Sequence, residues 1–331
     1  MSTKHTFLVR PQAGGERLDQ VLVSHLEGRI EPALSRRRAR KFIDEGAVFV
    51  DGKVVRVASR PVQAGATVLL IAEGYEALAQ TEEQPEEQPV GVSLGADDIL
   101  YEDADIIAVN KPAGLPAQAT RDPARDHLVA VVTRFLQARD GVKEPYVGLQ
   151  HRLDAETSGV MVFARSKRAN AGLTEAFRER TTQKTYRALT SGDPKYSPLA
   201  DEPLTQWMVE NHLGRDRNSK VFRQAEVRSG GDWAQTEFRV LEATKTALYV
   251  EATPHTGRTH QIRVHLASSD IPILGDTVYG GPRHIGGKAV ERTMLHAWRL
   301  ELPHPVTKEW LVIECPLPED FEAVRQRLFG V

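Results

Sequence analysis

One carboxylate in the sequence is placed as a catalytic group would be. Asp154 lies in the segment HRLDAETSG, His151 to Gly159, which has neither a helical nor a strand period and precedes a strand-like run. A carboxylate on a loop at the edge of a sheet, beside a guanidinium such as that of Arg152, stays ionised at neutral pH and can act as a nucleophile or a base. Residue types alone favour the alternative, in which Asp154 caps a turn and pairs with Arg152.

A second polar segment, HTGRTHQIRVH, could bind an anion or a metal. It holds three histidines spaced by five residues, His255, His260 and His265. Positions five apart on a helix are about 140° apart around its axis, so these side chains do not share a face, and no acidic residue lies among them. We therefore expect no metal site. We interpret Arg258 and Arg263 as partners of phosphate or carboxylate groups, with His260 and Gln261 as polar supports.

Two further segments carry reactive side chains on or next to strands. Tyr186 lies in the strand-like run QKTYRAL; such a tyrosine usually packs in the core, but it offers a flat stacking surface if it faces a cleft. Lys111 lies in VNKPAGLP, a strand that ends in a rigid loop containing Pro and Gly. The sequence contains no GxxxxGK motif followed by Ser or Thr, no GxSxG and no HExxH. ATP hydrolysis, serine hydrolysis and zinc proteolysis therefore lack their usual signatures.

Basic residues cluster in the N-terminal part of the chain. The helix expected over SRRRARKFIDE has Ser35 as its N-cap and ends at Gly46. Its cations are Arg36, Arg37, Arg38, Arg40 and Lys41, and Lys53 and Arg56 follow them. A run of charges is usually a solvated helix face. Here, five cations in six residues without an intervening acid favour a phosphate-binding surface.

These segments need strands and helices that bring them together. The N-terminal part predicts two helices, over residues 17–26 and 35–45, and a hairpin VFVDGKVV that turns at Asp51 and Gly52. Farther on, strand-like runs cover residues 106–110, 159–164, 185–189, 247–252 and 310–315, and helix-like runs cover 127–138, 168–180 and 261–269. Several strand pairs lack an intervening helix, which predicts an α+β fold rather than a regular βαβ winding.

Length and composition limit the class of protein. A chain of 331 residues suggests two domains. A single Cys excludes an intrachain disulfide, and no run approaches the ~20 apolar residues of a membrane helix, so we expect a cytoplasmic protein without a membrane partner. The net charge is −2, but residues 76–105 hold ten acids and no Lys or Arg, whereas residues 1–75 and 106–331 each carry +4. The net charge therefore does not argue against a nucleic-acid partner.

Four motifs together resemble those of one enzyme family. NKPAGL, HRLDAETSGVMVFA, KTYRAL and GRTHQIRVHL occur here in the order typical of the RluA-type family of pseudouridine synthases. Residues 11–75, with RLDQVL, the basic helix and the VFVDGKVV hairpin, resemble the S4-like RNA-binding domain that accompanies many members. The resemblance implies a catalytic domain over 99–331 with a mixed, largely antiparallel sheet, a small α/β RNA-binding domain over 11–75, and an acidic Pro-containing linker over 76–98.

The resemblance also implies a reaction without a cofactor or a metal. A pseudouridine synthase breaks the bond between ribose and the uracil ring nitrogen, turns the base within the pocket and joins carbon 5 to the sugar. Asp154 matches the family's catalytic carboxylate, which attacks the anomeric carbon or removes a sugar proton. Tyr186 matches the tyrosine that stacks on the base and takes the carbon 5 proton, and Arg263 matches the basic residue that pairs with the carboxylate.

Substrate-binding residues are expected around these three. Arg152 matches an arginine that fills the gap left when the uridine leaves its stack, a step required because the sugar carbon is inaccessible in a paired helix. Leu153 and Ile262 are expected to form apolar walls of the pocket. The other expected substrate-binding residues are Lys111, Arg258, His260 and Gln261.

The implied partner is structured RNA, and the protein is expected to act as a monomer. Ribosomal RNA of the large subunit is favoured over transfer RNA, because an N-terminal RNA-binding domain is commoner among the ribosomal RNA enzymes. Two alternatives stay open. One is a catalytically silent RNA-binding or ribosome-assembly protein that kept the fold. The other is a nucleoside or glycoside hydrolase, which needs a second, acid-acting carboxylate, and Glu156 is the only sequence neighbour.

Overall fold

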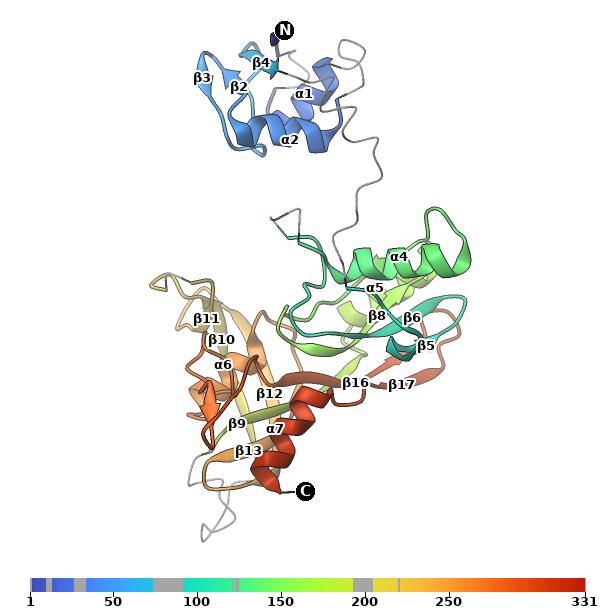
Figure 1. Cartoon of the computed structure of the whole chain (residues 1–331), viewed down its shortest axis with the longest axis vertical. Helices are drawn as coiled ribbons and strands as arrows, with labels where there is room; N and C mark the ends of the chain where they lie inside the picture. The colour runs from blue at the N-terminus through green and yellow to red at the C-terminus, as the bar shows by residue number, and fades with distance from the viewer. Residues whose placement is uncertain are drawn as a thin grey trace. The chain divides into compact units, whose positions relative to one another are not determined.

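The chain forms two compact units (Figure 1), within residues 1–90 and 91–331. The computed structural model describes residues 2–9, 14–26, 34–73, 92–120, 122, 125–192, 205–219 and 221–330. Most of the acidic linker expected over 76–98 falls on residues 74–91, which lie outside the described residues. Its character and the exact domain limits therefore stay predictions.

The small unit combines two helices with a four-stranded antiparallel sheet of order β1-β4-β2-β3. Its elements are β1 Ser2–Leu8, α1 Leu18–Leu26, α2 Arg36–Glu45, β2 Val48–Val50, β3 Lys53–Val54 and β4 Thr67–Glu73. Apolar side chains from both helices and from β2 and β4 form one core, to which α1 contributes Leu18, Val21, Leu22 and Leu26. Burial of these side chains stabilises the small unit.

Local signals determine where the elements of the small unit begin and end. The side chain of Ser35 accepts a hydrogen bond from the backbone nitrogen of Arg38 at 3.2 Å, and α2 ends at Gly46 in the left-handed conformation, with φ 81°. Asp51 and Gly52 have φ values of 49° and 76°, as a two-residue hairpin turn of the primed type requires. The predicted cap, helix end and turn are therefore confirmed.

The large unit is built on one mixed sheet of order β11-β10-β12-β13-β9-β16-β8-β6-β5, with β17 paired to β16 and β7 to β8. The strands are β5 Ile99–Glu102, β6 Ile106–Lys111, β7 Gly148–Leu149, β8 Ser158–Ala164, β9 Gln183–Ser191, β10 Gln206–Arg215, β11 Gln224–Glu226, β12 Asp232–Ala243, β13 Ala247–Pro254, β16 Leu295–Pro303 and β17 Trp310–Glu314. Among the pairs of strands that the structure describes, β16 with β8 is parallel and the others are antiparallel. The fold is α+β with a largely antiparallel sheet, as predicted.

Helices flank this sheet (Figure 1). They are α4 Leu128–Asp140, α5 Lys167–Arg178, α6 Gln261–Ser268 and α7 Glu319–Phe329, with a short 3-10 turn, η2 Ala96–Asp98, and a small hairpin, β14 His284–Ile285 with β15 Lys288–Ala289. Figure 1 shows α4 and α5 beside β8 and β6, and α7 lies near β13, where the Phe321 ring meets that of Tyr249 at 6.3 Å. The helices α4, α5 and α6 were predicted from the sequence, whereas α7 was not.

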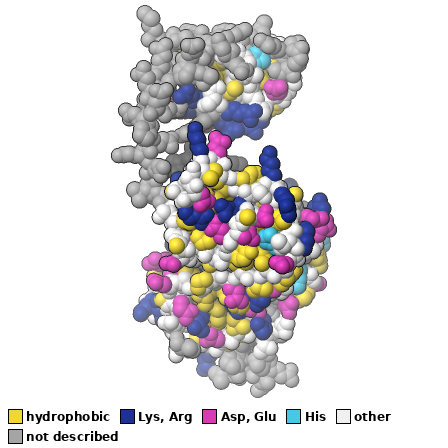
Figure 2. Space-filling view, turned by 90° about the vertical axis from the view of Figure 1, so that its right-hand side faces the viewer, with side chains coloured by type: hydrophobic (Ala, Val, Ile, Leu, Met, Phe, Trp, Pro, Cys, Tyr) yellow, Lys and Arg dark blue, Asp and Glu magenta, His cyan; other side chains and the backbone are white. Residues whose placement is uncertain are grey.

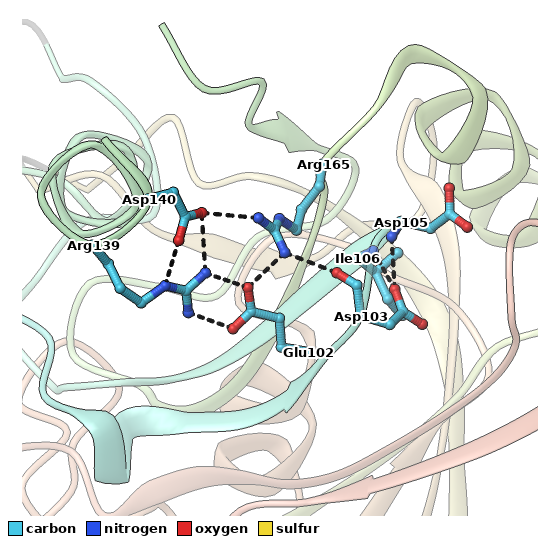
Figure 3. Close-up of polar contacts among 7 residues, drawn as sticks. All are labelled: Glu102, Asp103, Asp105, Ile106, Arg139, Asp140 and Arg165. Atoms are coloured by element: carbon cyan, nitrogen blue, oxygen red, sulfur yellow. Dashed lines mark hydrogen bonds and ion pairs between the residues drawn. The ribbon is translucent and has the colours of Figure 1, made fainter. Parts of the chain in front are cut away.

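An ion-pair network joins α4 to the edge of the sheet (Figure 3). Arg139 contacts Glu102 at 2.5 Å and Asp140 at 2.7 Å, and Arg165 contacts the same two carboxylates at 2.6 and 3.0 Å. In the adjacent turn, the Asp103 carboxylate accepts hydrogen bonds from two backbone nitrogens, each at 2.8 Å. Because each charge has two partners of opposite sign, the network fixes the end of α4 against β5 better than single surface pairs would.

The register of the central strands brings the predicted motifs into line. Lys111 of β6 lies opposite Gly159 of β8, Gly159 lies opposite Ala297 of β16, and Ala297 lies opposite Tyr186 of β9. Gly159 has a φ of 123°, and a Cβ there would lie 2.3 Å from the carbonyl oxygen of Ala297, so only glycine fits. The loop that carries Asp154 therefore leads into β8, and only β16 lies between β8 and the strand of Tyr186.

Candidate active site

The loop that carries Asp154 is supported from beneath by a buried lysine. Lys111 is fully buried, and its Nζ donates hydrogen bonds to the carbonyl oxygens of Pro112, Leu115 and Ala155 at 2.8, 2.7 and 2.9 Å. The sequence predicts that Lys111 contacts the substrate. In the structure, three backbone carbonyl oxygens surround its ammonium instead. We interpret Lys111 as a residue that positions the loop, because one of its acceptors belongs to the neighbour of Asp154.

Arg263 lies between two carboxylates. Its Nη1 donates to Oδ2 of Asp154 at 3.1 Å, while Nε and Nη2 donate to the two oxygens of Asp276 at 2.7 and 2.8 Å. The Asp276 side chain is 1% exposed and that of Asp154 is 28% exposed, so one partner is buried and the other is open to solvent. Burial acts to lower the pKa of Arg263, but Asp276 and Asp154 more than offset it and the pKa is raised. The guanidinium is therefore held charged beside Asp154.

His260 also reaches the carboxylate. Its Nε2 lies 3.7 Å from Oδ2 of Asp154, and its Nδ1 lies 2.8 Å from the hydroxyl oxygen of Tyr279. That hydroxyl oxygen accepts a hydrogen bond from the backbone nitrogen of Gln224 at 2.8 Å, which leaves its own proton free to bond Nδ1. Burial lowers the pKa of His260 against the charge of Asp154. These contacts favour a neutral imidazole whose Nε2 proton faces Asp154.

Asp154 opens into a cavity of about 720 Å³, large enough for a nucleotide. Leu153 and Ile262 contribute buried apolar side chains to its lining, and Tyr186 lines it from β9. Burial and, second, the charge of Asp154 raise the pKa of Tyr186, so its hydroxyl keeps its proton at neutral pH. The structure therefore brings a carboxylate, an aromatic side chain and apolar walls together in one cavity.

The cavity is basic, although the chain is not. Its lining contains the five cations Arg152, Arg180, Lys184, Arg258 and Arg263. Asp154 supplies the one carboxylate of this lining, whereas the whole chain carries a net charge of −2. Such a lining suits a polyanion. Glu156 is exposed and does not belong to the lining, so the second carboxylate that a hydrolase needs is not found among the described lining residues.

Gln261 and Arg258 are engaged with the protein itself. Gln261 is buried, and its Oε1 accepts hydrogen bonds from Oγ1 of Thr256 at 2.7 Å and from the backbone nitrogen of Arg258 at 3.0 Å. Its Nε2 donates to the carbonyl oxygen of Gln235 at 2.9 Å. Arg258 lines the cavity while its Nε donates to the carbonyl oxygen of Trp233 at 3.0 Å. Gln261 thus shapes the loop before α6, and Arg258 faces the cavity from a fixed position.

The three histidines spaced by five residues do not meet. His265 is buried in the core, where its ring nitrogens lie 2.9 Å from Oγ1 of Thr236 and 3.0 Å from Oδ1 of Asn211, and burial lowers its pKa to about 4. Within the described ranges, no three side chains of His, Cys, Asp or Glu gather as metal ligands would. A helix long and apolar enough to cross a bilayer is likewise not found in this part of the chain.

The small unit presents several of its predicted RNA-binding cations to solvent. Figure 2 shows Lys and Arg side chains gathered on its surface. Arg36, Lys41 and Lys53 are exposed, and Arg38 is half-buried. The side chain of Arg37 lies outside what the structure describes. The exposed cations remain candidates for contact with phosphates.

Arg40 and Arg56 instead bind groups of the small unit. Nε of Arg40 donates to Oδ2 of Asp19 at 2.8 Å, and the Asp19 side chain is 1% exposed. Nη1 of Arg56 donates to the carbonyl oxygen of Asp44 at 2.6 Å, near the end of α2. Arg40 therefore joins α2 to α1, and Arg56 satisfies a carbonyl that the helix end leaves free.

Asp276 and Tyr279 were not singled out from the sequence. Both lie in GDTVYGG, residues 275–281, where the available signal was a pair of polar side chains in a turn bounded by glycines. Gly275 has a φ of 79°, and a Cβ there would lie 1.9 Å from the carbonyl oxygen of Arg292. The tight turn brings Asp276 to Arg263 and Tyr279 to His260, so it completes the surroundings of the carboxylate.

Comparison with known proteins agrees with this geometry. The family model described as RNA pseudouridylate synthase matches residues 105–268, and the S4 domain model matches residues 16–68. A relative from Neisseria meningitidis serogroup B, named Ribosomal large subunit pseudouridine synthase D, is 35% identical over 93% of this chain and 78% of that protein. An RNA pseudouridine synthase of Aquifex aeolicus that is named as uncharacterized is 36% identical over 93% of this chain and 92% of that protein.

A solved structure shares the fold of the large unit. Human RNA Pseudouridylate Synthase Domain Containing 4 is 31% identical to this chain, with a TM-score of 0.54 over 70% of this chain and 92% of that one. The residues matched by the family model, 105–268, include Asp154, Tyr186 and Arg263, which the structure brings to one cavity. The chain belongs to the RluA-type family of RNA pseudouridine synthases and carries an S4 domain in its N-terminal part.

Proposed function

We propose that this pseudouridine synthase modifies uridines of large-subunit ribosomal RNA. The name of the Neisseria relative, which aligns with 93% of this chain, supports the choice of RNA. The exposed cations of the small unit and the basic lining of the cavity supply the charge that binding to a structured RNA needs. We place the reaction in the cytoplasm and assign it to a monomer, because one chain supplies all the residues described at the cavity.

The carboxylate of Asp154 is the reacting group in this proposal. It either attacks the anomeric carbon, while the electron pair of the broken bond leaves with uracil, or removes a proton from the neighbouring sugar carbon and later returns it. The detached uracil then turns, its carbon 5 bonds to the anomeric carbon, and the carbon 5 proton is transferred to the ring nitrogen. Substrate and product contain the same atoms, so no other reactant is consumed.

Arg263 and His260 orient the carboxylate of Asp154. The guanidinium lies 3.1 Å from Oδ2 of Asp154, and its charge stabilises the carboxylate before attack and after release of the sugar. The Nε2 atom of His260, 3.7 Å away, approaches hydrogen-bonding distance with a small shift of the ring. Both contacts are made to Oδ2 of Asp154 and restrict the orientation of the carboxylate. An oxygen that attacks a carbon or accepts a proton needs such a fixed orientation.

Tyr186 stacks on the target base. Because the pKa of Tyr186 is raised by burial and by Asp154, its hydroxyl keeps its proton in the resting site. Removal of the carbon 5 proton by Tyr186 therefore requires that its own proton first pass to a neighbour such as Asp154. Leu153 and Ile262 exclude water around the detached base, and the exposed side chain of Arg152 fills the space that the flipped uridine leaves.

A map of pseudouridines in cellular RNA tests this function. We expect cells that lack the gene to lose pseudouridine at one or a few sites of large-subunit ribosomal RNA, and the wild-type gene to restore it. Asp154→Asn should not restore it, whereas Glu156→Gln, a matched change two residues away on an exposed side chain, should. Loss confined to transfer RNA would reject the proposed substrate. Restoration by Asp154→Asn would reject the assignment of the reacting group.

A further inference from the structure

Three cations of the cavity lining have no carboxylate partner among the residues that the structure describes. Lys184 and Tyr186 are two positions apart on β9, so both side chains leave the same face of the strand, about 7 Å apart along it. Both residues line the cavity, and so do Arg180 and Thr182 in the turn between α5 and β9. Arg152 lines the cavity next to Leu153. The phosphate lobe is the part of the cavity lined by Arg152, Arg180 and Lys184.

The ammonium of Lys184 packs on the ring of Phe177 and forms no ion pair among the described residues. The residue is half-buried, and its Nζ lies 5.0 Å from the centre of the Phe177 ring. That ring stacks on His151 at 4.7 Å, and His151 is fixed by a hydrogen bond from the backbone nitrogen of Val162 at 3.1 Å. Within the described part of the chain, Lys184 has no carboxylate partner, and burial lowers its pKa to about 8. A ligand with negative charge would satisfy this ammonium.

Arg180 adopts an unusual backbone conformation at the edge of the lobe. Its φ is 56°, in the left-handed region that favours Gly or Asn, yet the residue is an arginine with an exposed side chain that lines the cavity. Arg152 is exposed as well, and neither arginine has an ion pair among the residues described. The other two cations of the lining are engaged, since Arg263 binds Asp154 and Asp276, and Arg258 binds a backbone carbonyl.

We propose that Lys184, with Arg180, binds a backbone phosphate next to the target uridine and so draws the flipped nucleotide into the cavity. A nucleotide that flips turns about its own backbone, so the two phosphates that flank it follow it to the mouth of the pocket. The uracil ring is neutral and needs hydrogen bonds, whereas three lining cations without an ion pair among the described residues match a charged group. The inference rests on the proposed function, because it assumes that the cavity receives a uridine of an RNA strand.

The test is a thermodynamic cycle between Lys184 and single phosphates. Binding is measured with the Asp154→Asn protein, which holds RNA without converting it, on a fragment that contains the mapped uridine. Lys184→Met removes the charge and keeps most of the side chain, and Lys184→Arg keeps the charge. Lys245→Met is the matched control, because Lys245 is exposed two residues before β13, and the cavity residue Pro254 is at the other end of that strand. A neutral methylphosphonate replaces the phosphate on either side of the uridine.

We expect Lys184→Met to weaken binding of the unmodified RNA by about 10- to 100-fold and to reduce the slope of log K against log salt by roughly one unit. Lys184→Arg and Lys245→Met should stay within about threefold of the parent protein. On RNA with one of the two neutral linkages, the parent should lose at least as much affinity as the Lys184→Met change costs. Lys184→Met should lose clearly less than the parent on that RNA, because only Arg180 still contacts the linkage. If the loss caused by Lys184→Met and the loss caused by the neutral linkage simply add, for both linkages, the proposal is overturned.

A second variant keeps the inference testable if Lys184→Met unfolds. Arg180→Gly places the residue that the left-handed conformation favours, so the protein should melt at the same or a higher temperature while its RNA binding weakens. Binding by Arg180→Gly equal to that of the parent would contradict a role of Arg180 in the lobe. These binding measurements are independent of turnover. Wild-type protein that binds the fragment but forms no pseudouridine would count against the proposed function and leave the phosphate lobe standing.

Discussion

Replacement of Asp276 by Asn removes the charge that anchors Arg263 and leaves the shape of the side chain almost unchanged. Asp276 accepts two hydrogen bonds from Arg263, at 2.7 and 2.8 Å, and its side chain is 1% exposed. An amide oxygen can accept one of these bonds, but the amide nitrogen is itself a donor and would face the guanidinium. Arg263 should therefore lose one strong bond and its buried negative partner.

The size of the effect follows from these contacts. A hydrogen bond to a charged group contributes about 1.5–3 kcal/mol. A buried charge left without any partner costs about 3–5 kcal/mol. The loss should be smaller here, because Asp154 remains beside Arg263 at 3.1 Å and balances part of its charge. We expect the free energy of unfolding of the large unit to fall by about 2–3 kcal/mol. For a unit of this size, the melting temperature should drop by roughly 4–12 °C.

Urea unfolding of the full chain, followed by tryptophan fluorescence, measures this loss. Asp232→Asn is the matched control, because Asp232 faces Arg258 at 3.8 Å with its side chain 72% exposed, and its loss should change stability by less than about 0.5 kcal/mol. Asp276 does not line the cavity, so Asp276→Asn should lower kcat about tenfold or more through looser placement of Asp154 and leave KM almost unchanged. Stability and kcat equal to those of Asp232→Asn would refute this reasoning.

Three other changes test further contacts. Arg40→Ala removes a partner of the buried Asp19 and should lower the free energy of unfolding of the small unit by about 1–2 kcal/mol in calorimetry, whereas the exposed Arg36→Ala should not. Lys111→Met leaves three carbonyl oxygens without their donor and should lower kcat more than it changes KM in steady-state turnover. Burial lowers the pKa of His265 to about 4 in the folded state, from 6.5 in the unfolded state, so the unfolded state binds the proton at a higher pH. The free energy of unfolding should therefore fall by up to about 3 kcal/mol as the pH drops from 6.5 to 4. His265→Gln should flatten that pH profile of urea unfolding.

Features with local causes were predictable from the sequence. The cap at Ser35, the end of α2 at Gly46 and the turn at Asp51 depend on side chains within a few residues, and all three are found as predicted. The motifs around Asp154, Tyr186 and Arg263 were recognisable as a set, and the structure brings these residues to one cavity. The sequence placed them along the chain, and the register of β8, β16 and β9 places them in space.

Features that depend on distant partners were not predictable. Arg40 was expected to bind RNA because its neighbours are basic, but its partner Asp19 lies on another helix, 21 residues away. Lys111 was expected at the substrate because it lies in the family motif NKPAGL, although one of its acceptors, the carbonyl of Ala155, lies 44 residues along the chain. The strand β10 was missed because most of its side chains are exposed or half-buried, so its sequence has no apolar run, and it includes few β-branched side chains.

Conversion of a defined RNA by the purified protein tests the central claim most directly. Large-subunit ribosomal RNA made by transcription contains no pseudouridine, so mass spectrometry of its nucleosides after incubation detects each isomerisation. We predict pseudouridine and no free uracil with the wild-type chain and with Glu156→Gln, and a rate lower by about 10³-fold or more with Asp154→Asn. Release of free uracil, or normal formation of pseudouridine by Asp154→Asn, would contradict an isomerisation that depends on this carboxylate.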